Sequence, residues 1–365
     1  MRFFKHFPFW TLGHVLTIIV ISILFTFIVF KFILSRKTIK EGNKNFFLMT
    51  WSLIIIFLIL ELIFTFIPSS QGVRRRTYGS LLWKQYYWNP INSIGYRDNE
   101  INEKDTSKIK VFFLGDSFTA GAGTKNAEDR VSEQLNAFCE NCTSYNLGQG
   151  GTDTKNEYLR LLAYPLKPDI LILQYFGNDI DDAAKNNGVI FNYKLMPYNN
   201  IPGFTHFIVK KSCFINYFYW KFSREFPANN YADFVYKTYH NDTILREHLS
   251  DLDKITDHAV NNSIELYVIV YPMLNAEPED SINTYVKIVS DHLVQKNIPV
   301  LNVSEVLKKM NIPVYNRVAS ITDPHPSVLL HETVAAELSE LIKKNQERSS
   351  SDKKNKIIWK ASSPE

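Results

Sequence analysis

The chain has 365 residues, 45% of them hydrophobic, which is enough for one large domain with additional segments. Its formal net charge of +4 is small for this length and argues against nucleic acid as a partner. Cysteines and histidines do not cluster at metal-ligand spacing, so no metal site is predicted.

Two long apolar runs near the N-terminus predict a transmembrane helical hairpin over residues 1–70. The runs cover about 10–34 and 46–67, and each can cross roughly 30 Å of membrane lipid at about 1.5 Å per residue. A short basic turn, SRKTIKEGNKN, separates them. The first run is too long for a cleaved signal peptide and has no small-residue cleavage site.

Glu61 interrupts the second run, and a carboxyl group in lipid is costly. Two interpretations are open: a contact with His14 on the first helix, or a carboxyl group near the interface that snorkels or stays protonated. Basic residues are equally numerous on the two sides of the hairpin, so they do not decide its orientation.

Residues 71–108 form a polar connector with scattered aromatic residues, and from residue 109 short apolar strands alternate with helices. The strand-like runs are IKVFFLG, SYNLG, DILILQYFGND, IELYVIVYP and IPVLNV. Such alternation is typical of a parallel sheet covered by helices on both faces. We therefore predict an α/β fold, a three-layer α/β/α sandwich, over residues 109–345. Residues 346–365 are predicted to be a disordered tail.

The alternation lapses at about 185–245, where the sequence is much richer in aromatic residues than the chain average of 14%. Three interpretations of this insertion are open. It forms a small core of its own, it is a cap that binds substrate, or it is a surface that dips into the membrane interface.

Cys139 and Cys142 form a C-x-x-C motif. They are either small residues at a helix end or a local disulfide, which needs an oxidising compartment. A thioredoxin-like redox motif is disfavoured, because the pair follows a predicted helix instead of opening one.

Ser117 is the candidate nucleophile, in the stretch KVFFLGDSFTAGAG. The glycine spacing fits neither a Walker loop nor a dinucleotide-binding loop. A serine that follows a strand and opens a helix would point into a cleft, and its own N–H could face a developing oxyanion. The alternative is that Ser117 has only a structural role as a helix cap.

Three more candidates lie at predicted strand ends or before the last helix. Gly151 in NLGQGGTDT can present a bare N–H, and Asn178 in FGNDI can donate from its amide. His325 in TDPHPS would be the general base that a serine needs. For each of these residues, the alternative is a purely structural role in a turn or a helix cap. The carboxyl ends of parallel strands share one edge of a sheet, so we expect these groups to converge there.

The ordered set FLGDSFT, NLGQGG, GND and DPHPS resembles the four signature blocks of the SGNH (GDSL) hydrolase superfamily, and the lead-in NSIGYRDNEI resembles a segment before its first strand. The likeness covers about residues 90–345 without the insertion. It implies a three-layer fold and hydrolysis or transfer of acyl esters, with Ser117 as nucleophile and His325 as base. The Ser117 N–H, Gly151 and Asn178 would form the oxyanion hole.

One departure concerns the acid. The usual motif has aspartate three residues before the histidine, where this chain has Thr322, and Asp323 lies only two residues before it. We expect Asp323 to orient the imidazole, with a backbone carbonyl as the alternative. Asp116 and Asp179 are interpreted as turn and scaffold residues, and His331 is given no role.

The sequence thus predicts a membrane-anchored serine esterase that needs no cofactor. By resemblance, it would cleave O-acetyl or other short acyl esters of an envelope glycan or lipid, on the extracytoplasmic side. One alternative is an O-acyltransferase that modifies a polysaccharide with a membrane partner. Another is a catalytically silent binding protein. The acyl chain, the alcohol and the oligomeric state are left open.

Overall fold

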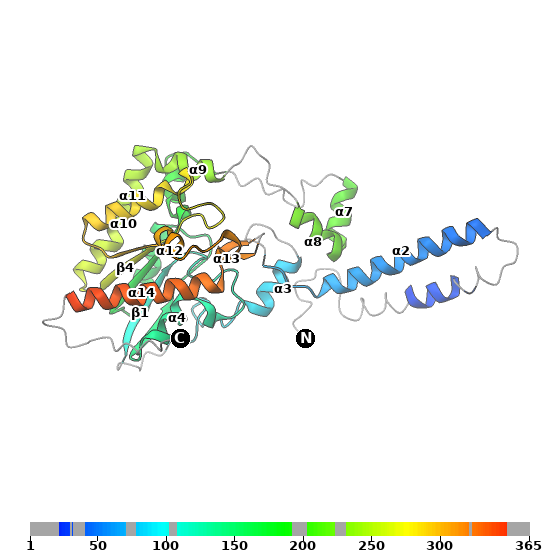
Figure 1. Cartoon of the computed structure of the whole chain (residues 1–365), viewed down its shortest axis with the longest axis horizontal. Helices are drawn as coiled ribbons and strands as arrows, with labels where there is room; N and C mark the ends of the chain where they lie inside the picture. Colours follow the sequence, from blue (N-terminus) through cyan, green and yellow to red (C-terminus); the bar gives the residue numbers. More distant parts are fainter. Residues whose placement is uncertain are drawn as a thin grey trace. The chain divides into compact units, whose positions relative to one another are not determined.

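The computed structural model describes residues 22–29, 31, 41–70, 78–101, 108–191, 203–222, 231–320 and 323–348. The chain forms two compact units, shown in Figure 1. The smaller comprises Met1–Tyr86 and Leu195–Arg224, and the larger comprises Tyr87–Lys194 and Glu225–Glu365.

The larger unit is built on a five-stranded parallel sheet with strand order β2-β1-β3-β4-β5. Its strands are β1 Ile109–Gly115, β2 Cys142–Asn146, β3 Ile170–Tyr175, β4 Glu265–Val270 and β5 Val300–Asn302. Every residue of β3 is buried, as a continuous apolar run in a parallel sheet requires. The chain reverses its direction of progress across the sheet between β1 and β3, so the loops after these two strands flank a topological switch point.

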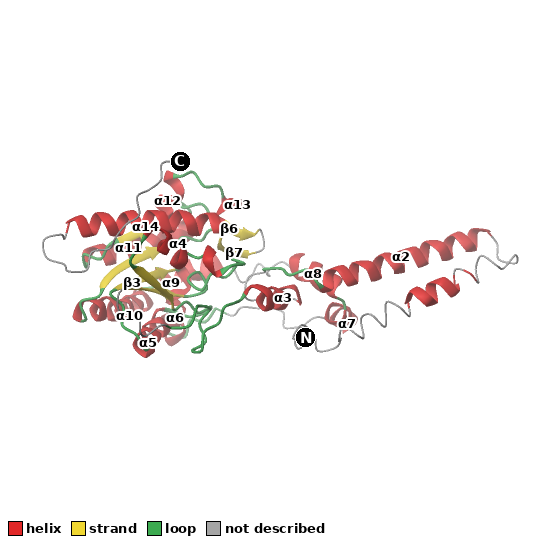
Figure 2. Ribbon diagram, turned by 90° about the horizontal axis from the view of Figure 1, so that it is seen from below, coloured by secondary structure: helices red, strands yellow, loops and turns green. Residues whose placement is uncertain are grey.

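Helices cover both faces of the sheet, which confirms the predicted three-layer arrangement (Figure 2). Alternate residues of β1 enter opposite cores: Phe112 and Leu114 belong to one, Val111 and Phe113 to the other. The helices of the first core are α5 Thr154–Ala163, α6 Asp181–Asn186, α9 Tyr231–Tyr239, α10 Asp242–Asn261 and α11 Thr284–Gln295. Those of the second are α4 Val131–Phe138, α12 Val303–Lys309 and α14 Val328–Arg348.

The remaining elements of the larger unit are short. Strands β6 Val318–Ser320 and β7 Asp323–Pro326 form an antiparallel pair. The others are α13 Val314–Arg317 and the 3-10 turns η1 Ala127–Asp129, η2 Gly177–Ile180 and η4 Ser281–Asn283. Strand β7 carries the DPHP part of the TDPHPS motif, so Asp323 and His325 both lie on a strand.

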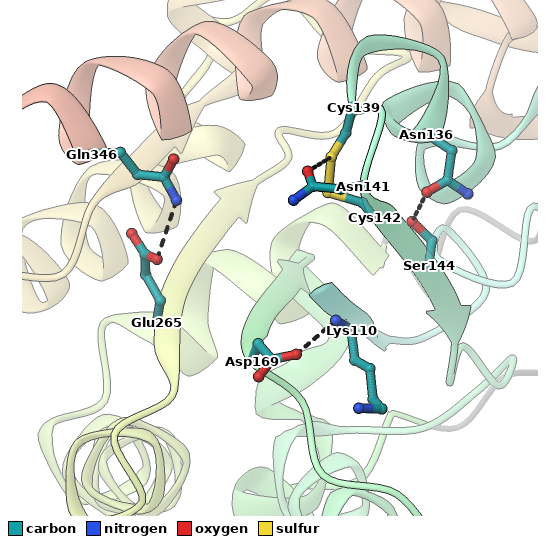
Figure 3. Close-up of a disulfide and its surroundings, with 9 residues drawn as sticks. All are labelled: Lys110, Asn136, Cys139, Asn141, Cys142, Ser144, Asp169, Glu265 and Gln346. Atoms are coloured by element: carbon teal, nitrogen blue, oxygen red, sulfur yellow. Dashed lines mark hydrogen bonds between the residues drawn. A yellow bond between two sulfur atoms is a disulfide. The ribbon is translucent and has the colours of Figure 1, made fainter. Parts of the chain in front are cut away.

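Cys139 and Cys142 form a disulfide between the end of α4 and the first residue of β2 (Figure 3). The interpretation of the pair as mere small residues at a helix end is therefore wrong. Cys142 is paired with Ile109, the first residue of β1, whereas Ser117 follows the last. The disulfide thus lies at the N-terminal ends of the strands, whereas Ser117 lies beyond the C-terminal end of β1.

Removing this disulfide is expected to lower stability without affecting the site. The double variant Cys139→Ala/Cys142→Ala should lose about 2 kcal/mol of unfolding free energy, the loop-closure contribution expected for so short a loop. Urea titration of the full chain in detergent, compared with the oxidised parent, measures this loss. Unchanged stability would contradict the expectation, and so would a selective loss of activity in the folded variant.

The smaller unit contains α2 Glu41–Thr65, α7 Gly203–Lys211 and α8 Cys213–Phe222, and α3 Tyr78–Tyr87 runs to its boundary. Within α2, Lys44–Thr65 has a mean hydropathy of 2.5 and none of its most apolar window is buried, so it is long and apolar enough to cross a membrane. Of the first predicted span, only residues 22–29 and 31 are among the described residues, and they are helical. The second half of the predicted hairpin is thus present as a helix, and the hairpin as a whole stays a prediction.

The predicted boundaries differ from the observed ones in two places. The aromatic insertion at 185–245 is divided: α7 and α8 belong to the smaller unit, whereas α9 contributes the buried Val235 and Tyr239 to the larger one. The predicted connector 71–108 contains α3, and its later part belongs to the larger unit, where Arg97 and Asp98 are buried. Both differences arise from contacts between residues far apart in the chain. The tail beyond Arg348 lies outside the described residues.

Candidate active site

Ser117 lies two residues beyond the end of β1 and is 8% exposed. Gly115, the last residue of β1, has no room for a side chain, because an added Cβ would lie 2.1 Å from Thr119 Oγ1 and 2.8 Å from the Gln174 carbonyl oxygen. Residues 117–123 form consecutive turns, and α4 begins only at Val131. The prediction that Ser117 opens a helix is therefore wrong.

The turns follow from the glycines of this loop. Gly121 has φ +70° and Gly123 has φ +93°, a backbone region that glycine adopts readily and that interrupts a helix. Ser117 is held instead by a turn bond, in which its carbonyl oxygen accepts from the Ala122 N–H at 2.9 Å. The N–H of Ser117 thus belongs to a series of turns and not to the first turn of an assigned α-helix.

His325 and Asp323 lie beside Ser117 and are buried with it. His325 Nε2 is 3.0 Å from Ser117 Oγ, and His325 Nδ1 is 2.5 Å from Asp323 Oδ1. Asp323 is 2% exposed and His325 is 7% exposed. A carboxylate at Nδ1 favours the tautomer whose Nε2 is unprotonated, and this nitrogen can accept the Ser117 proton.

The two-residue spacing of the acid and the histidine is explained by β7. Both residues belong to this strand, and residues i and i+2 of a strand point to the same side. Asp323 therefore reaches His325 without a shift of the backbone. Thr322, which occupies the usual position of the acid, lies outside the described residues.

Asn178 follows β3 in the turn η2 and is oriented by Asp116. Its Nδ2 donates to Asp116 Oδ2 at 3.0 Å, and Asp116 Oδ1 accepts from the Phe118 N–H at 2.8 Å. Ser117 Oγ is also 3.4 Å from Asp116 Oδ2. An amide nitrogen carries two hydrogens, so one N–H of Asn178 is left for another acceptor. Burial raises the pKa of Asp116, although these hydrogen bonds oppose the rise.

The loop after β2 approaches Ser117 through Gly150. A Cβ added to Gly150 would lie 3.5 Å from Ser117 Cβ, whereas one added to Gly151 would have no described atom within 4 Å. Gly151 has φ +76°, which favours glycine. Its N–H belongs to the peptide unit that follows Gly150, so it lies one peptide bond from the point of closest approach.

Arg160 on α5 ties this loop to the end of β1, and the sequence analysis missed it. Its Nη2 donates to the Gly115 carbonyl oxygen at 2.9 Å and to Thr152 Oγ1 at 3.0 Å, and its Nη1 is 3.4 Å from Gln149 Oε1. The available signal was a lone arginine in the otherwise apolar stretch YLRLLA. One guanidinium thus joins the strand that leads to Ser117 with the loop that carries Gly151.

Replacing Arg160 by alanine is expected to lower kcat for a soluble ester by about 10- to 100-fold, because a hydrogen bond from a charged group contributes about 1.5–3 kcal/mol. KM should change little, since the loop is needed mainly in the transition state. Arg160→Lys should retain less than the full rate, because a single ammonium group cannot reproduce the planar arrangement of the two guanidinium nitrogens that donate here. Lys155→Ala, on the exposed side of α5, is the matched control. A purely KM effect would contradict the positioning role.

The larger unit also has buried carboxyl groups behind the site. Glu157 is fully buried, neither of its carboxyl oxygens has a hydrogen-bond partner among the described residues, and its Oε1 is 3.9 Å from Arg160 Nη2. Burial raises the pKa of Glu157 to about 8, Arg160 opposes the rise, and Asp116 and Asp153 add to it. Burial likewise raises the pKa of Asp179, with Glu157 contributing.

The raised pKa of Glu157 predicts a specific pH dependence of stability. Between about pH 4.5 and 8 the folded chain holds a proton that the unfolded chain releases, so the unfolding free energy should fall as pH rises through this window. Glu157→Gln mimics the protonated group. It should raise the unfolding free energy by roughly 2–4 kcal/mol at pH 8 and change it little at pH 4. Denaturant titrations at both pH values measure this; an equal effect at both would contradict it.

The predicted connector supports the turn after Ser117. Arg97 Nη1 donates to the Gly121 carbonyl oxygen at 2.6 Å, and its Nη2 donates to the Thr124 carbonyl oxygen at 3.1 Å. Asp98 Oδ2 accepts from the Asn146 N–H at 2.9 Å, at the end of β2. The segment that precedes β1 therefore stabilises the loop after Ser117 through buried hydrogen bonds.

Burial lowers the pKa of His331 to about 3, so this histidine is a neutral core residue.

No family model matches the sequence, and no curated protein matches it. Solved structures do show a likeness. A lipolytic protein of the G-D-S-L family from Desulfitobacterium hafniense DCB-2 is 18% identical, with 64% of this chain and 99% of that chain covered and a TM-score of 0.40. The acetyl xylan esterase AlAXEase is 16% identical, with 64% and 100% covered and a TM-score of 0.39. A catalytic mutant of Axe2, an acetylxylan esterase from Geobacillus stearothermophilus, is 14% identical, with 65% and 94% covered and a TM-score of 0.39.

Proposed function

We propose that this protein is a serine esterase that hydrolyses acyl esters through Ser117, His325 and Asp323. The observation that carries the proposal is the chain of buried contacts from Ser117 Oγ to His325 Nε2 at 3.0 Å and from His325 Nδ1 to Asp323 at 2.5 Å. A serine hydroxyl is a weak nucleophile until an adjacent base takes its proton, and this arrangement supplies the base and orients it.

In the first half of the reaction, His325 Nε2 takes the Ser117 proton while Oγ bonds to the ester carbonyl carbon. The negative charge on the former carbonyl oxygen is met by the N–H groups of Ser117 and Gly151 and by the free N–H of Asn178. Asp323 stabilises the imidazolium that forms. His325 then gives its proton to the departing alkoxide, and the acyl group stays on Ser117.

In the second half, a water molecule replaces the alcohol. His325 removes a proton from this water as its oxygen attacks the acyl carbon, and the same oxyanion donors are used again. Collapse of the intermediate returns the proton to Ser117 Oγ and releases the carboxylic acid. The mechanism uses only groups of this chain and water.

For the substrate and setting, we propose a short acyl or O-acetyl ester of an envelope glycan or lipid, with the chain anchored in membrane lipid by its N-terminal helices. The apolar helix α2 supports the anchor. The disulfide between Cys139 and Cys142 supports an extracytoplasmic larger unit, because such bonds persist in oxidising compartments. The displaced acid could favour a silent binding protein, but the contact of Asp323 with His325 argues against that alternative.

A fluorophosphonate probe tests the nucleophile directly. Incubation of the folded, detergent-solubilised chain should give a covalent adduct on the peptide that contains Ser117, identified by mass spectrometry, and prior unfolding should abolish it. Hydrolysis of p-nitrophenyl acetate should stop as the adduct forms. Absence of labelling, or labelling of another serine with activity retained, would overturn the proposal.

An ester panel then separates hydrolysis from transfer. Acetylated glycans, short acyl esters and phospholipids are each supplied with and without a glycan acceptor, and the free acid and the acylated acceptor are quantified. An esterase releases acid at the same rate in both conditions. Accumulation of acylated glycan at the expense of acid would favour the O-acyltransferase.

A further inference from the structure

Glu61 lies near the end of α2, and its carboxylate binds the N-terminus of α8. Oε2 accepts from Ser212 Oγ at 2.6 Å and from the Phe214 N–H at 3.2 Å, and Oε1 accepts from the Cys213 N–H at 2.5 Å. The first N–H groups of a helix have no partner within the helix and carry partial positive charge, so a carboxylate is well matched to them. Glu61 is thus satisfied by protein, which replaces the interpretation of a snorkelling group; His14 lies outside the described residues.

Aromatic side chains extend this contact along α2. The ring of Phe214 lies 6.0 Å from that of Phe57 and 5.2 Å from that of Phe64, and Phe64 also contacts Tyr217 at 4.9 Å and Phe218 at 5.3 Å, measured between ring centroids. Edge-to-face and tilted ring contacts of this kind stabilise packing beyond what the buried area alone contributes. Helix α8 is therefore fastened to α2 by a charged cap and by an aromatic strip.

Helix α7 is in turn fastened to α8. Val209 and Trp220 are buried against each other, and Asn216 Nδ2 donates to the Val209 carbonyl oxygen at 3.0 Å. Helices α7 and α8 therefore pack together as one element against α2. The position of α7 is thus determined by the contact of α8 with the end of α2.

The contacts set the depth of this element relative to the proposed membrane span. Glu61 is four residues from Thr65, the end of the span, which corresponds to about 6 Å along the helix, and Phe57 is about 12 Å from it. Amphipathic helices in the membrane interface bury their apolar face by about 5–10 Å into the boundary of headgroups and acyl chains. The start of α8 falls within that depth.

Helix α7 presents two phenylalanines that the described residues leave exposed. Phe204 is 76% exposed and Phe207 is 58% exposed, and residues three apart share one face of a helix. Lys210 and Lys211 follow at the end of the same helix, where cationic groups suit anionic lipid headgroups. Exposed phenylalanines next to lysines, at the end of a membrane-spanning helix, fit a lipid surface.

We propose that α7–α8 is an interfacial membrane element that lies against the end of α2, with Phe204 and Phe207 inserted into lipid. The occupant of this apolar face is the bilayer itself. The inference rests on the proposed membrane anchor, because the depth of α8 in the bilayer is defined only if α2 crosses it. It gives part of the predicted insertion a role as a second membrane contact, separate from the larger unit.

Site-specific fluorescence quenching tests the proposal. An environment-sensitive probe is attached to a single cysteine that replaces either Leu53 or Phe207 in the full chain. Cys213 is first replaced by alanine, which keeps the backbone N–H that Glu61 binds. Leu53 is 60% exposed in the middle of α2. The chain is placed in phosphatidylcholine–phosphatidylglycerol nanodiscs that contain lipids with a nitroxide either near the headgroup or near the end of the acyl chain.

The expected result is that the Phe207 probe is blue-shifted and loses most of its emission to the shallow nitroxide. The Leu53 probe should be quenched by the deep nitroxide. Quenching at Leu53 without quenching at Phe207 would overturn this inference and leave the anchor intact. Absence of quenching at Leu53 would overturn the anchor and, with it, the inference.

Glu61 variants test the fastening of α8. Glu61→Leu removes both acceptor oxygens and is expected to reduce quenching at Phe207 while leaving Leu53 quenched. Glu61→Gln keeps one acceptor oxygen and should reduce it less. Unchanged quenching at Phe207 in both variants would overturn the role of the carboxylate as the cap that holds α8 at this depth.

Discussion

Replacing Ser117 by alanine is expected to lower kcat for p-nitrophenyl acetate by on the order of 10^4- to 10^6-fold, as removal of the nucleophile does in serine hydrolases. The physical reason is that no other hydroxyl among the described contacts of His325 Nε2 can accept the acyl group. The fold should survive, because among the described residues Ser117 Oγ has only one further hydrogen-bond partner, Asp116 Oδ2 at 3.4 Å. Initial rates and thermal unfolding of the full chain in detergent measure both effects.

The matched control is Ser339→Ala. Ser339 is also buried, at 6% exposed, but its hydroxyl donates only within its own helix, to the Ala336 carbonyl oxygen. It should retain the parental rate and react with the fluorophosphonate probe. An alanine variant of Ser117 that hydrolyses the ester as fast as the parent would remove the chemical basis of the proposed function.

Replacing Asp323 by asparagine is expected to lower kcat by about 10^4-fold, the size of effect seen when the acid of such a triad becomes an amide. The amide can donate to His325 Nδ1, which favours the tautomer with a proton on Nε2. That nitrogen then cannot accept the Ser117 proton. Steady-state rates and the rate of fluorophosphonate labelling should fall together, because both need the activated hydroxyl.

Asp291→Asn is the control for this change. Asp291 is a surface carboxylate paired with Lys287, and exposed pairs of this kind contribute little to stability. It should be indistinguishable from the parent protein. If Asp323→Asn kept more than about a tenth of the activity, a group other than Asp323 would have to orient His325, as in the backbone-carbonyl alternative.

The parallel sheet was predictable because it depends on a local pattern. Fully buried parallel strands read as continuous apolar runs, and β1, β3 and β4 were found from such runs alone. Since the carboxyl ends of parallel strands share one edge, the same pattern brought the loops of Ser117 and Asn178 together. The turn structure after Ser117 was missed, because the positive φ angles of Gly121 and Gly123 override a helix-like composition.

The sheet, the strand-end motifs and the apolar helix could be predicted because each depends on the pattern of residues that are close in sequence. Long-range contacts account for the rest. The guanidinium of Arg160 meets Gly115, and the carboxylate of Glu61 meets α8 about 150 residues later. Local periodicity carries no information about which distant group a polar side chain will meet, because that pairing is chosen by packing and by the need to satisfy buried charge.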